Sequence, residues 1–211
     1  MEEAVFTVRP VKRGEHMIVL GLTGGIASGK STASQWFVSQ GIRVLDADKM
    51  NHHLLNFNQE VIDQISKSFS KDVIKNGKID RETLGKMVFN DPNKRKQLEQ
   101  IVHPVIKSMI KEELSRHQDE PLIVLDVPLL FETDFDQLCH QTLVIYVDEK
   151  TQISRLMTRN HFSKEESLKR ISAQMSLTEK AKKATYVISN EGTKEEMYEQ
   201  LKQLYEQLIG V

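Results

Sequence analysis

The chain has 211 residues, of which 39% are hydrophobic and 28% are charged, so it is long enough for one globular α/β domain with small insertions. Its formal net charge of −1 provides no general attraction for nucleic acid, and no apolar stretch approaches the ~20 residues needed to cross a bilayer. The single cysteine, Cys139, excludes an intrachain disulfide, and we therefore expect a cytoplasmic protein with neither nucleic acid nor a membrane as its partner.

The N-terminal part of the chain contains one predicted strand. Residues 1–16 have no clear pattern and lack the apolar stretch of a signal peptide, so we interpret them as an N-terminal extension or leader. The apolar run at 17–22 then predicts a short strand buried on both faces of a parallel sheet, and Met17 is a candidate natural start. This interpretation assigns residues 17–211 to a single domain.

A glycine-rich segment follows this strand. Residues 24–31, called the phosphate loop below, read Gly-Gly-Ile-Ala-Ser-Gly-Lys-Ser and match the pattern G-x-x-x-x-G-K-[ST]. Glycines let such a loop turn its N–H groups toward an anion, Lys30 adds a positive charge for the outer phosphates, and the Ser31 hydroxyl is placed to bind Mg²⁺. We therefore expect ATP to contact Gly25, Ile26, Ala27, Ser28, Gly29, Lys30, Ser31 and Thr32.

The residues after the phosphate loop have the pattern of a helix. Ala33, Trp36 and Phe37 recur at helical spacing, and Gly41 has the position expected just past a helix end. The alternative for the loop is a glycine-rich turn that binds nothing. The strand before the loop and the helix after it disfavour that alternative.

Four further apolar runs predict strands of the same sheet. They lie at 42–45, 122–125, 143–147 and 186–189 and alternate with helical patterns, which predicts an α/β fold with a doubly wound, parallel, five-stranded sheet. In such sheets ligands bind beyond the carboxyl ends of the strands. The polar residues that follow the predicted strands are therefore candidates for a site: Asp46, Asp48, Asp126, Asp148 and Asn190.

One segment is too long to be a simple crossover between strands, and a second has a basic helical pattern. Residues 49–120 predict a helical subdomain, with a turn at Asn76-Gly77 and a new helix at Asp91-Pro92. Residues 151–181 form a basic helical segment, for which a kinase lid and a charged surface hairpin are both open. The remaining core comprises residues 17–48, 121–150 and 182–211, with a C-terminal helix whose apolar stripe predicts core packing.

Together these motifs resemble the dephospho-coenzyme A kinase family from about residue 17 to residue 204. The most distinctive similarity is Asp-Val-Pro-Leu-Leu-Phe-Glu at 126–132, which general nucleotide kinases lack. Family members commonly have Gly where Ala27 stands and Asp where Thr185 stands. Further similar segments lie at 21–32, 44–48, 81–89, 101–104, 155–159 with Gln174, and 184–190.

The resemblance implies a P-loop NTPase-like kinase with a helical acceptor-binding subdomain and a helical lid. It implies that the enzyme transfers the γ-phosphoryl group of ATP, with Mg²⁺, to the ribose 3′-hydroxyl of dephospho-CoA, the last step of CoA biosynthesis. It assigns the role of base to Asp48, for which Asp46 is the competing candidate. Lys30 and Arg159 would stabilise the transferred phosphate, with Arg155 a weaker second candidate.

The other site assignments retain alternatives. Asp126 is a candidate Mg²⁺ ligand with Ser31, or a cap of the following turn. On the acceptor side, Arg81 would meet the pyrophosphate of dephospho-CoA or form an internal ion pair, and His103-Pro104 would bind substrate or only fix a helix start. Asn190 would contact the adenine of ATP or form a turn.

Two other functions remain open at this stage. One is a small-molecule or nucleotide kinase of the same fold with another acceptor, and the other is a nucleotide-binding switch without catalysis. The sequence does not determine the oligomeric state.

Overall fold

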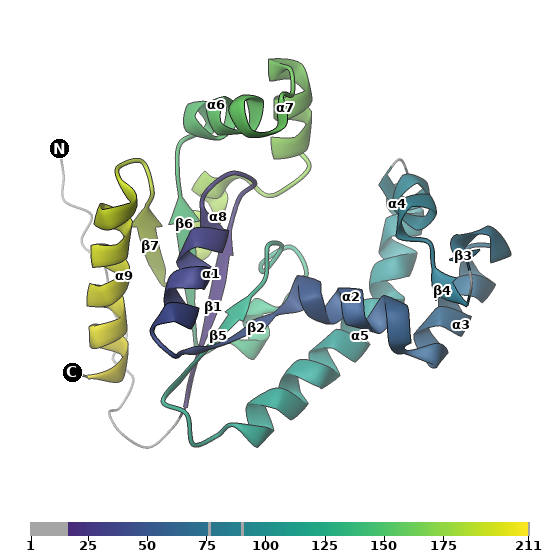
Figure 1. Ribbon diagram of the computed structural model, residues 1–211, viewed down its shortest axis with the longest axis horizontal. Helices are drawn as coiled ribbons and strands as arrows, with labels where there is room; N and C mark the ends of the chain where they lie inside the picture. The colour runs from purple at the N-terminus through teal and green to yellow at the C-terminus, as the bar shows by residue number, and fades with distance from the viewer. Residues whose placement is uncertain (1–16, 76, 90, 211) are drawn as a thin grey trace. The chain divides into compact units, whose positions relative to one another are not determined.

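The computed structural model describes residues 17–75, 77–89 and 91–210, and Figure 1 traces its elements. The predicted extension at 1–16 and Asn76 of the predicted turn lie outside the described residues. The chain divides into two compact units, the first formed by residues 17–45 with 117–210 and the second by residues 46–116.

A five-stranded sheet forms the centre of the first unit, in the order β2-β5-β1-β6-β7. The central strand β1 pairs in parallel with β5 and β6, and β6 pairs in parallel with β7, as the sequence predicted. β1 runs to Gly24, beyond the predicted end at 22, because Thr23 and Gly24 pair with Val144 and Ile145. The strands are β1 (Ile18–Gly24), β2 (Arg43–Asp46), β5 (Leu122–Asp126), β6 (Gln141–Tyr146) and β7 (Tyr186–Ser189).

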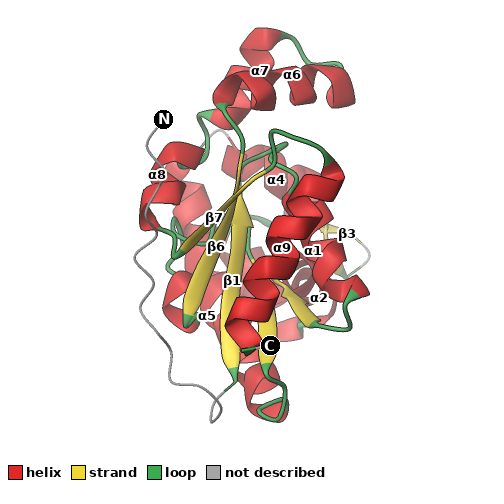
Figure 2. Ribbon diagram, turned by 90° about the vertical axis from the view of Figure 1, so that its left-hand side faces the viewer, coloured by secondary structure: helices red, strands yellow, loops and turns green. Residues whose placement is uncertain are grey.

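Apolar side chains cover both faces of this sheet. Helices α1 (Lys30–Ser39) and α9 (Lys194–Ile209) lie side by side on one face (Figure 2), where Phe37 is fully buried against β1 and β6. On the other face, Val144 of β6 packs against Leu177 of α8 (Leu177–Lys183). The two faces take alternate residues of β6, so residues 143–147 read as one continuous apolar run. The predicted stripe of α9 is confirmed as core packing, formed by Met197, Leu201, Leu204, Tyr205 and Leu208.

The basic segment between β6 and β7 contains three helices with clear start signals. α6 (Glu149–Asn160) and α7 (Lys164–Ile171) lie beyond the carboxyl edge of the sheet in both views (Figures 1 and 2), and α8 follows them. Asp148 caps α6 by accepting a hydrogen bond from the Thr151 N–H at 2.6 Å. Ser163 and Ser176 form capping boxes at the starts of α7 and α8, which fixes where each helix begins. A short 3₁₀ helix, η2 (Asp136–Leu138), precedes β6.

The second unit is mostly helical and contains a small hairpin that the sequence did not predict. Each strand of that hairpin has two residues, too few for an alternating pattern, and Gly77 turns between them with a φ of 74°. The elements are α2 (Ala47–Phe57), α3 (Gln59–Ser68), η1 (Lys71–Val73), β3 (Ile74–Lys75), β4 (Lys78–Ile79), α4 (Arg81–Phe89) and α5 (Pro92–Arg116).

The long helix α5 corrects the interpretation of His103-Pro104 as a helix start. α5 begins at Pro92, as predicted, where Asp91 accepts a hydrogen bond from the Asn93 N–H at 2.9 Å, and it continues past Pro104. An interior proline costs about 3 kcal/mol of helix stability, and each fully buried aliphatic side chain contributes about 1.5–3 kcal/mol. The helix buries Val102, Ile106 and Ile110, and together these side chains outweigh the proline.

Candidate active site

The phosphate loop connects β1 to α1 through strained backbone. Gly29 has a φ of 95° at the start of α1, and a Cβ there would lie 2.0 Å from Asn190 Nδ2, so the position requires glycine. Ala27 has a φ of 62°, a left-handed conformation that costs a non-glycine residue about 1–2 kcal/mol. This explains in physical terms why glycine is suitable at position 27.

Backbone N–H groups at the start of α1 are available to an anion. Within the described residues, the N–H groups of Gly29, Lys30 and Ser31 donate to no protein acceptor, and no side chain caps this helix. The first turn of α1 contains no acidic residue. Open N–H groups and the positive end of the helix dipole together attract phosphate.

Lys30 contacts an acid at the end of the neighbouring strand. Its ammonium donates a hydrogen bond to Asp126 Oδ1, and Asp126 is only 4% exposed. β5 delivers Asp126 to this place because it pairs in register with β1, with Asp126 opposite Leu22. The structure thus joins two residues that the sequence assigned separately, one to phosphate and one to Mg²⁺.

The donors near the loop suit a Mg²⁺ ion that phosphates help to hold. Among the described residues, no three His, Cys, Asp or Glu side chains cluster in the manner of a metal cage. Mg²⁺ is commonly bound by one or two protein oxygens, with phosphate oxygens and water as its remaining ligands. The exposed Ser31 hydroxyl and the Asp126 carboxylate have this chemistry.

Two glutamines from the basic segment hold the backbone of Ile26. The Ile26 N–H donates to Gln174 Oε1 at 3.0 Å, and Gln152 Nε2 donates to the Ile26 carbonyl at 2.8 Å. The amide of Ile26, which the sequence assigned to phosphate, therefore has a protein partner. Gln174 was noted only for its resemblance to the lid, and Gln152 was missed.

Asn190 supports the phosphate loop from the end of β7. Its Nδ2 donates to the Ser28 carbonyl at 2.8 Å, and its own carbonyl accepts a hydrogen bond from Arg155 at 2.7 Å. The sequence offered an adenine contact or a turn for Asn190, and the structure adds that its side-chain amide holds the loop backbone. Arg159 lies exposed near the end of α6, where its Nε donates to the Asn160 side chain at 2.8 Å.

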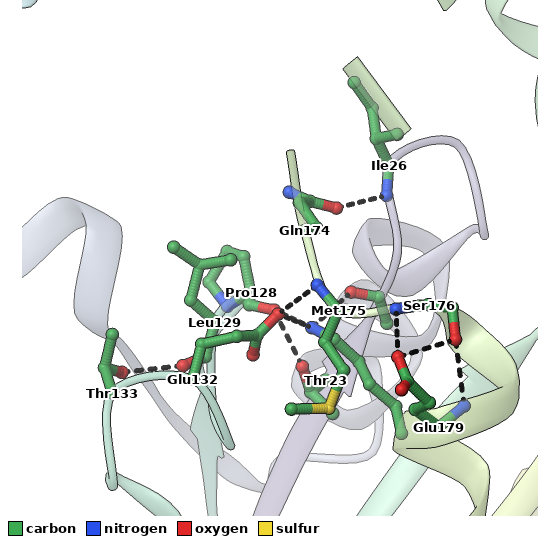
Figure 3. Close-up of polar contacts among 12 residues, drawn as sticks. Thr23, Ile26, Pro128, Leu129, Glu132, Thr133, Gln174, Met175, Ser176 and Glu179 are labelled. Carbon is green, nitrogen blue, oxygen red and sulfur yellow. Dashed lines mark hydrogen bonds and ion pairs between the residues drawn. The ribbon is translucent and has the colours of Figure 1, made fainter. Parts of the chain in front are cut away.

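A buried lysine next to the phosphate loop was also missed. Lys180 of α8 is fully buried, and its Nζ lies 2.6 Å from the Pro128 carbonyl, 3.0 Å from Glu132 Oε1 and 3.4 Å from the Gly24 carbonyl. Figure 3 shows Glu132 and Pro128 beside Thr23, whose hydroxyl also donates to the Pro128 carbonyl. Burial lowers the pKa of Lys180, and the nearby Glu132 carboxylate opposes this change.

The candidate acceptor-side residues lie in the second unit. Asp46 accepts a hydrogen bond from the Lys49 N–H at 3.0 Å and so caps α2. Asp48 is exposed in the first turn of the same helix. Arg81, also exposed, contacts the ring Nδ1 of His52, which is not the acidic partner that an internal ion pair needs. His103 is half-buried, and burial lowers the pKa of its imidazole.

The departure at Thr185 lies away from the phosphate loop. The Thr185 hydroxyl accepts a hydrogen bond from the Thr142 N–H at 3.1 Å, and the Thr185 N–H donates to the Thr142 hydroxyl at 3.0 Å. These contacts join the amino ends of β6 and β7, whereas the phosphate loop leaves the carboxyl end of β1. Having Thr at position 185, where family members commonly have Asp, therefore does not change the phosphate site.

Comparisons with known proteins give a consistent family. The family model described as dephospho-CoA kinase matches residues 18–196. Dephospho-CoA kinase of Oceanobacillus iheyensis is 46% identical over 187 residues, covering 87% of this chain and 94% of that protein. The corresponding enzyme of Latilactobacillus sakei is 43% identical over 189 residues, covering 89% and 94%.

Solved structures give the same result for the fold. The crystal structure of TT1252 from Thermus thermophilus has a TM-score of 0.78 at 37% identity, covering 92% of this chain and 98% of that one. Dephospho-CoA kinase from Campylobacter jejuni has a TM-score of 0.71 at 30% identity, with the same coverage. In the described part of the chain, no helix has both the length and the apolar character to cross a membrane.

Proposed function

Because the chain belongs to the dephospho-CoA kinase family and is a phosphotransferase of CoA biosynthesis, we propose which of its residues hold ATP and which prepare the acceptor. The phosphate loop binds the triphosphate of ATP. The observation that supports this most directly is the open start of α1, whose N–H groups have no acceptor among the described residues. Phosphoryl transfer depends mainly on positioning and on charge stabilisation, which these groups supply.

Mg²⁺ accompanies the nucleotide in this proposal. Ser31 and Asp126 would hold the ion, which would supply positive charge for the phosphate oxygens. Lys30 has a different task, since its ammonium can move from Asp126 toward the outer phosphates. The pair thereby keeps the lysine oriented before nucleotide binds.

Asp48 acts on the acceptor side. Its carboxylate accepts the proton or a hydrogen bond from the ribose 3′-hydroxyl of dephospho-CoA, which prepares the oxygen for attack. Asp48 is favoured over Asp46 because the Asp46 carboxylate already caps α2. Arg81 and His103 belong to the acceptor side as well, with Arg81 available to the pyrophosphate as an exposed guanidinium.

Arg159 is proposed to contact the transferred phosphate from α6. Its guanidinium is exposed and has only a neutral amide partner in the described structure, so it can be redirected at little cost. Arg155 is less available because it donates to the Asn190 carbonyl.

We propose that the reaction takes place in the cytoplasm, where ATP is supplied and a single cysteine stays reduced.

The activity is tested by ADP release with a set of acceptors. Purified protein is given ATP and Mg²⁺ with dephospho-CoA, nucleoside monophosphates or shikimate in turn, and we expect turnover with dephospho-CoA. Turnover of another acceptor alone would identify a kinase of different specificity. ATP binding without turnover of any acceptor would identify a nucleotide-dependent switch.

Substitution of Asp48 tests the proposed base. We expect Asp48→Asn to leave ATP affinity unchanged and to lower kcat by ~10²–10⁴-fold, the usual size of a general-base effect. Asp46→Asn is the matched control, because asparagine also caps helices well and should leave kcat near the wild-type value. Near-normal kcat in Asp48→Asn with a large loss in Asp46→Asn would transfer the role to Asp46.

A further inference from the structure

Lys180 and Glu132 form an ion pair that the proposed chemistry does not use. The Lys180 side chain has no exposed surface, and its three acceptors use all the hydrogens of an ammonium group. Glu132 is half-buried, and its Oε2 is enclosed without a hydrogen-bond partner among the described residues. Burying two charged groups costs free energy, so the presence of this pair calls for a physical explanation.

The contacts of Lys180 connect two backbone segments near the phosphate loop. The Gly24 carbonyl belongs to the first residue of the phosphate loop, 156 positions before Lys180. The Pro128 carbonyl lies two residues after Asp126, the acid that holds Lys30. One ammonium therefore fixes the backbone where the loop begins and where the Asp126 strand ends.

The contacts of Glu132 extend this connection to the base of α8. Its Oε1 accepts a hydrogen bond from the Met175 N–H at 3.0 Å as well as from Lys180. The neighbouring residue, Gln174, accepts a hydrogen bond from the Ile26 N–H of the phosphate loop (Figure 3). Residues 174–180 are thus attached both to the loop and to the 128–132 segment.

Stability alone explains this pair poorly. Removing an ammonium from water costs free energy that a single carboxylate repays only with good geometry, and apolar replacements of buried pairs are often neutral or stabilising. What the pair does provide is a fixed position for three backbone segments: the start of the phosphate loop, the segment after Asp126 and the residues before α8. Small displacements of such groups are costly in catalysis.

We propose that Lys180 and Glu132 act as a latch that fixes the phosphate loop, the segment after Asp126 and the base of α8 in the arrangement needed for transfer. Lys180 is a positioning residue in this inference, since it acts through the backbone at Gly24 and Pro128. The inference rests on the proposed phosphate-binding role of the loop.

The test compares Lys180→Met with the exposed control Lys182→Met on the same helix. Methionine keeps the length of the side chain and removes the charge. We expect Lys180→Met to lower kcat by roughly 10- to 100-fold while KM for dephospho-CoA stays within about twofold. Glu132→Gln keeps an oxygen for Met175 but leaves the Lys180 ammonium without its counter-charge, so it should lower kcat in the same direction as Lys180→Met and by a smaller factor. Lys182→Met should match the wild type.

A double variant separates positioning from folding. Lys180→Met leaves Glu132 without its cation, which can destabilise the fold, and Lys180→Met/Glu132→Gln removes that charge as well. We expect the double variant to recover thermal stability but not kcat. A folded single or double variant with wild-type kcat would overturn the latch, because a purely structural pair would change the melting temperature and leave kcat intact.

Hydrogen exchange in the wild-type protein decides the matter if neither Lys180 variant folds. The latch requires slow exchange of the Ile26 and Met175 amides without nucleotide, and exchange at the rate of exposed amides would refute it. Failure of the proposed function has a different signature. In that case the wild type and Lys182→Met would also fail to phosphorylate dephospho-CoA.

Discussion

At the scale of single residues, the one positive charge of Lys30 has two partners: the Asp126 carboxylate and, in the proposed function, the outer phosphates of ATP. Its ammonium neutralises Asp126 in the absence of nucleotide and is proposed to serve the outer phosphates when ATP is bound. Asp126 is almost fully buried, so removal of its cation leaves a carboxylate in poorly solvated surroundings. Substitution at position 30 therefore affects stability and activity by separate routes.

We expect Lys30→Ala to lower kcat/KM for ATP by at least about 10²-fold, through loss of charge at the phosphates. It should also destabilise the fold by about 3–5 kcal/mol, the usual cost of breaking a buried pair. Steady-state kinetics and thermal unfolding measure the two effects. In Lys30→Ala/Asp126→Asn, stability should return while activity stays low; recovery of both would contradict the role given to Lys30.

Cys139 permits a prediction about chemical reactivity. Burial, with a smaller contribution from the Asp136 charge, raises the pKa of its thiol to about 12. At pH 8 the reactive thiolate would then be about one part in 10⁴, so we expect a disulfide reagent to label the native protein very slowly. Labelling in guanidinium is the control, and the single cysteine makes it unambiguous. Complete labelling of the native protein within minutes would contradict this prediction.

The sequence predicted residues whose role is local and missed those whose role depends on distant contacts. The phosphate loop is a contiguous motif. Lys30 belongs to that motif, and Asp126 directly follows the apolar run of a predicted strand. Lys180 has neighbours that are 52 and 156 positions away, and in the sequence it is one of several lysines in a charged helix. Gln152 has the same difficulty, since its partner Ile26 is 126 positions away. No spacing pattern could have indicated these pairs.

At the scale of elements, the apolar pattern of the sequence predicted the main strands, whereas features that depend on pairing between distant segments were missed. The continuous apolar runs predicted the five strands, because strands covered on both faces have no polar side to reveal. Pattern failed where pairing decides: Gly24 joins β1 only through β6, and the hairpin of β3 and β4 has two-residue strands. It also failed at Pro104, which α5 accommodates because that helix has apolar contacts on both sides of the proline.

The start of α8 is the element on which the position of Lys180 depends. Ser176 Oγ accepts a hydrogen bond from the Glu179 N–H at 3.2 Å, and Glu179 in turn accepts one from the Ser176 N–H at 3.3 Å (Figure 3). We expect Ser176→Ala to cost about 1 kcal/mol of stability, a fall of roughly 2–4 °C in melting temperature for a chain of this size. Thermal unfolding measures this change.

Two further variants make the cap interpretation specific. Ser176→Asp retains an N-cap acceptor and should restore the melting temperature. Ser154→Ala, an exposed change within α6, should leave it unchanged or raise it slightly, because alanine has the higher helix propensity. Equal losses from Ser176→Ala and Ser154→Ala would argue against a capping contribution.

At the scale of the whole molecule, the first unit contains both the phosphate loop and the basic segment α6–α8 that contacts it. Gln152 from α6 binds the backbone carbonyl of Ile26, and Gln174 from the residues before α8 binds its N–H. A change in the Ile26 backbone on nucleotide binding would reach this segment through these two hydrogen bonds. The contacts favour a lid over a charged surface hairpin, and the lid stays a prediction.

Limited proteolysis with and without nucleotide tests the lid. α7 presents the exposed trypsin sites Lys164, Lys169 and Arg170, and Lys194 at the start of α9 is an exposed site outside the segment. If the basic segment closes over bound ATP, a non-hydrolysable ATP analogue should slow cleavage in α7 several-fold while cleavage after Lys194 continues at its former rate. Lys30→Ala, which loses phosphate binding, should lose this protection. Cleavage of α7 at the same rate with and without the analogue, in protein shown by calorimetry to have bound it, would favour the charged surface hairpin.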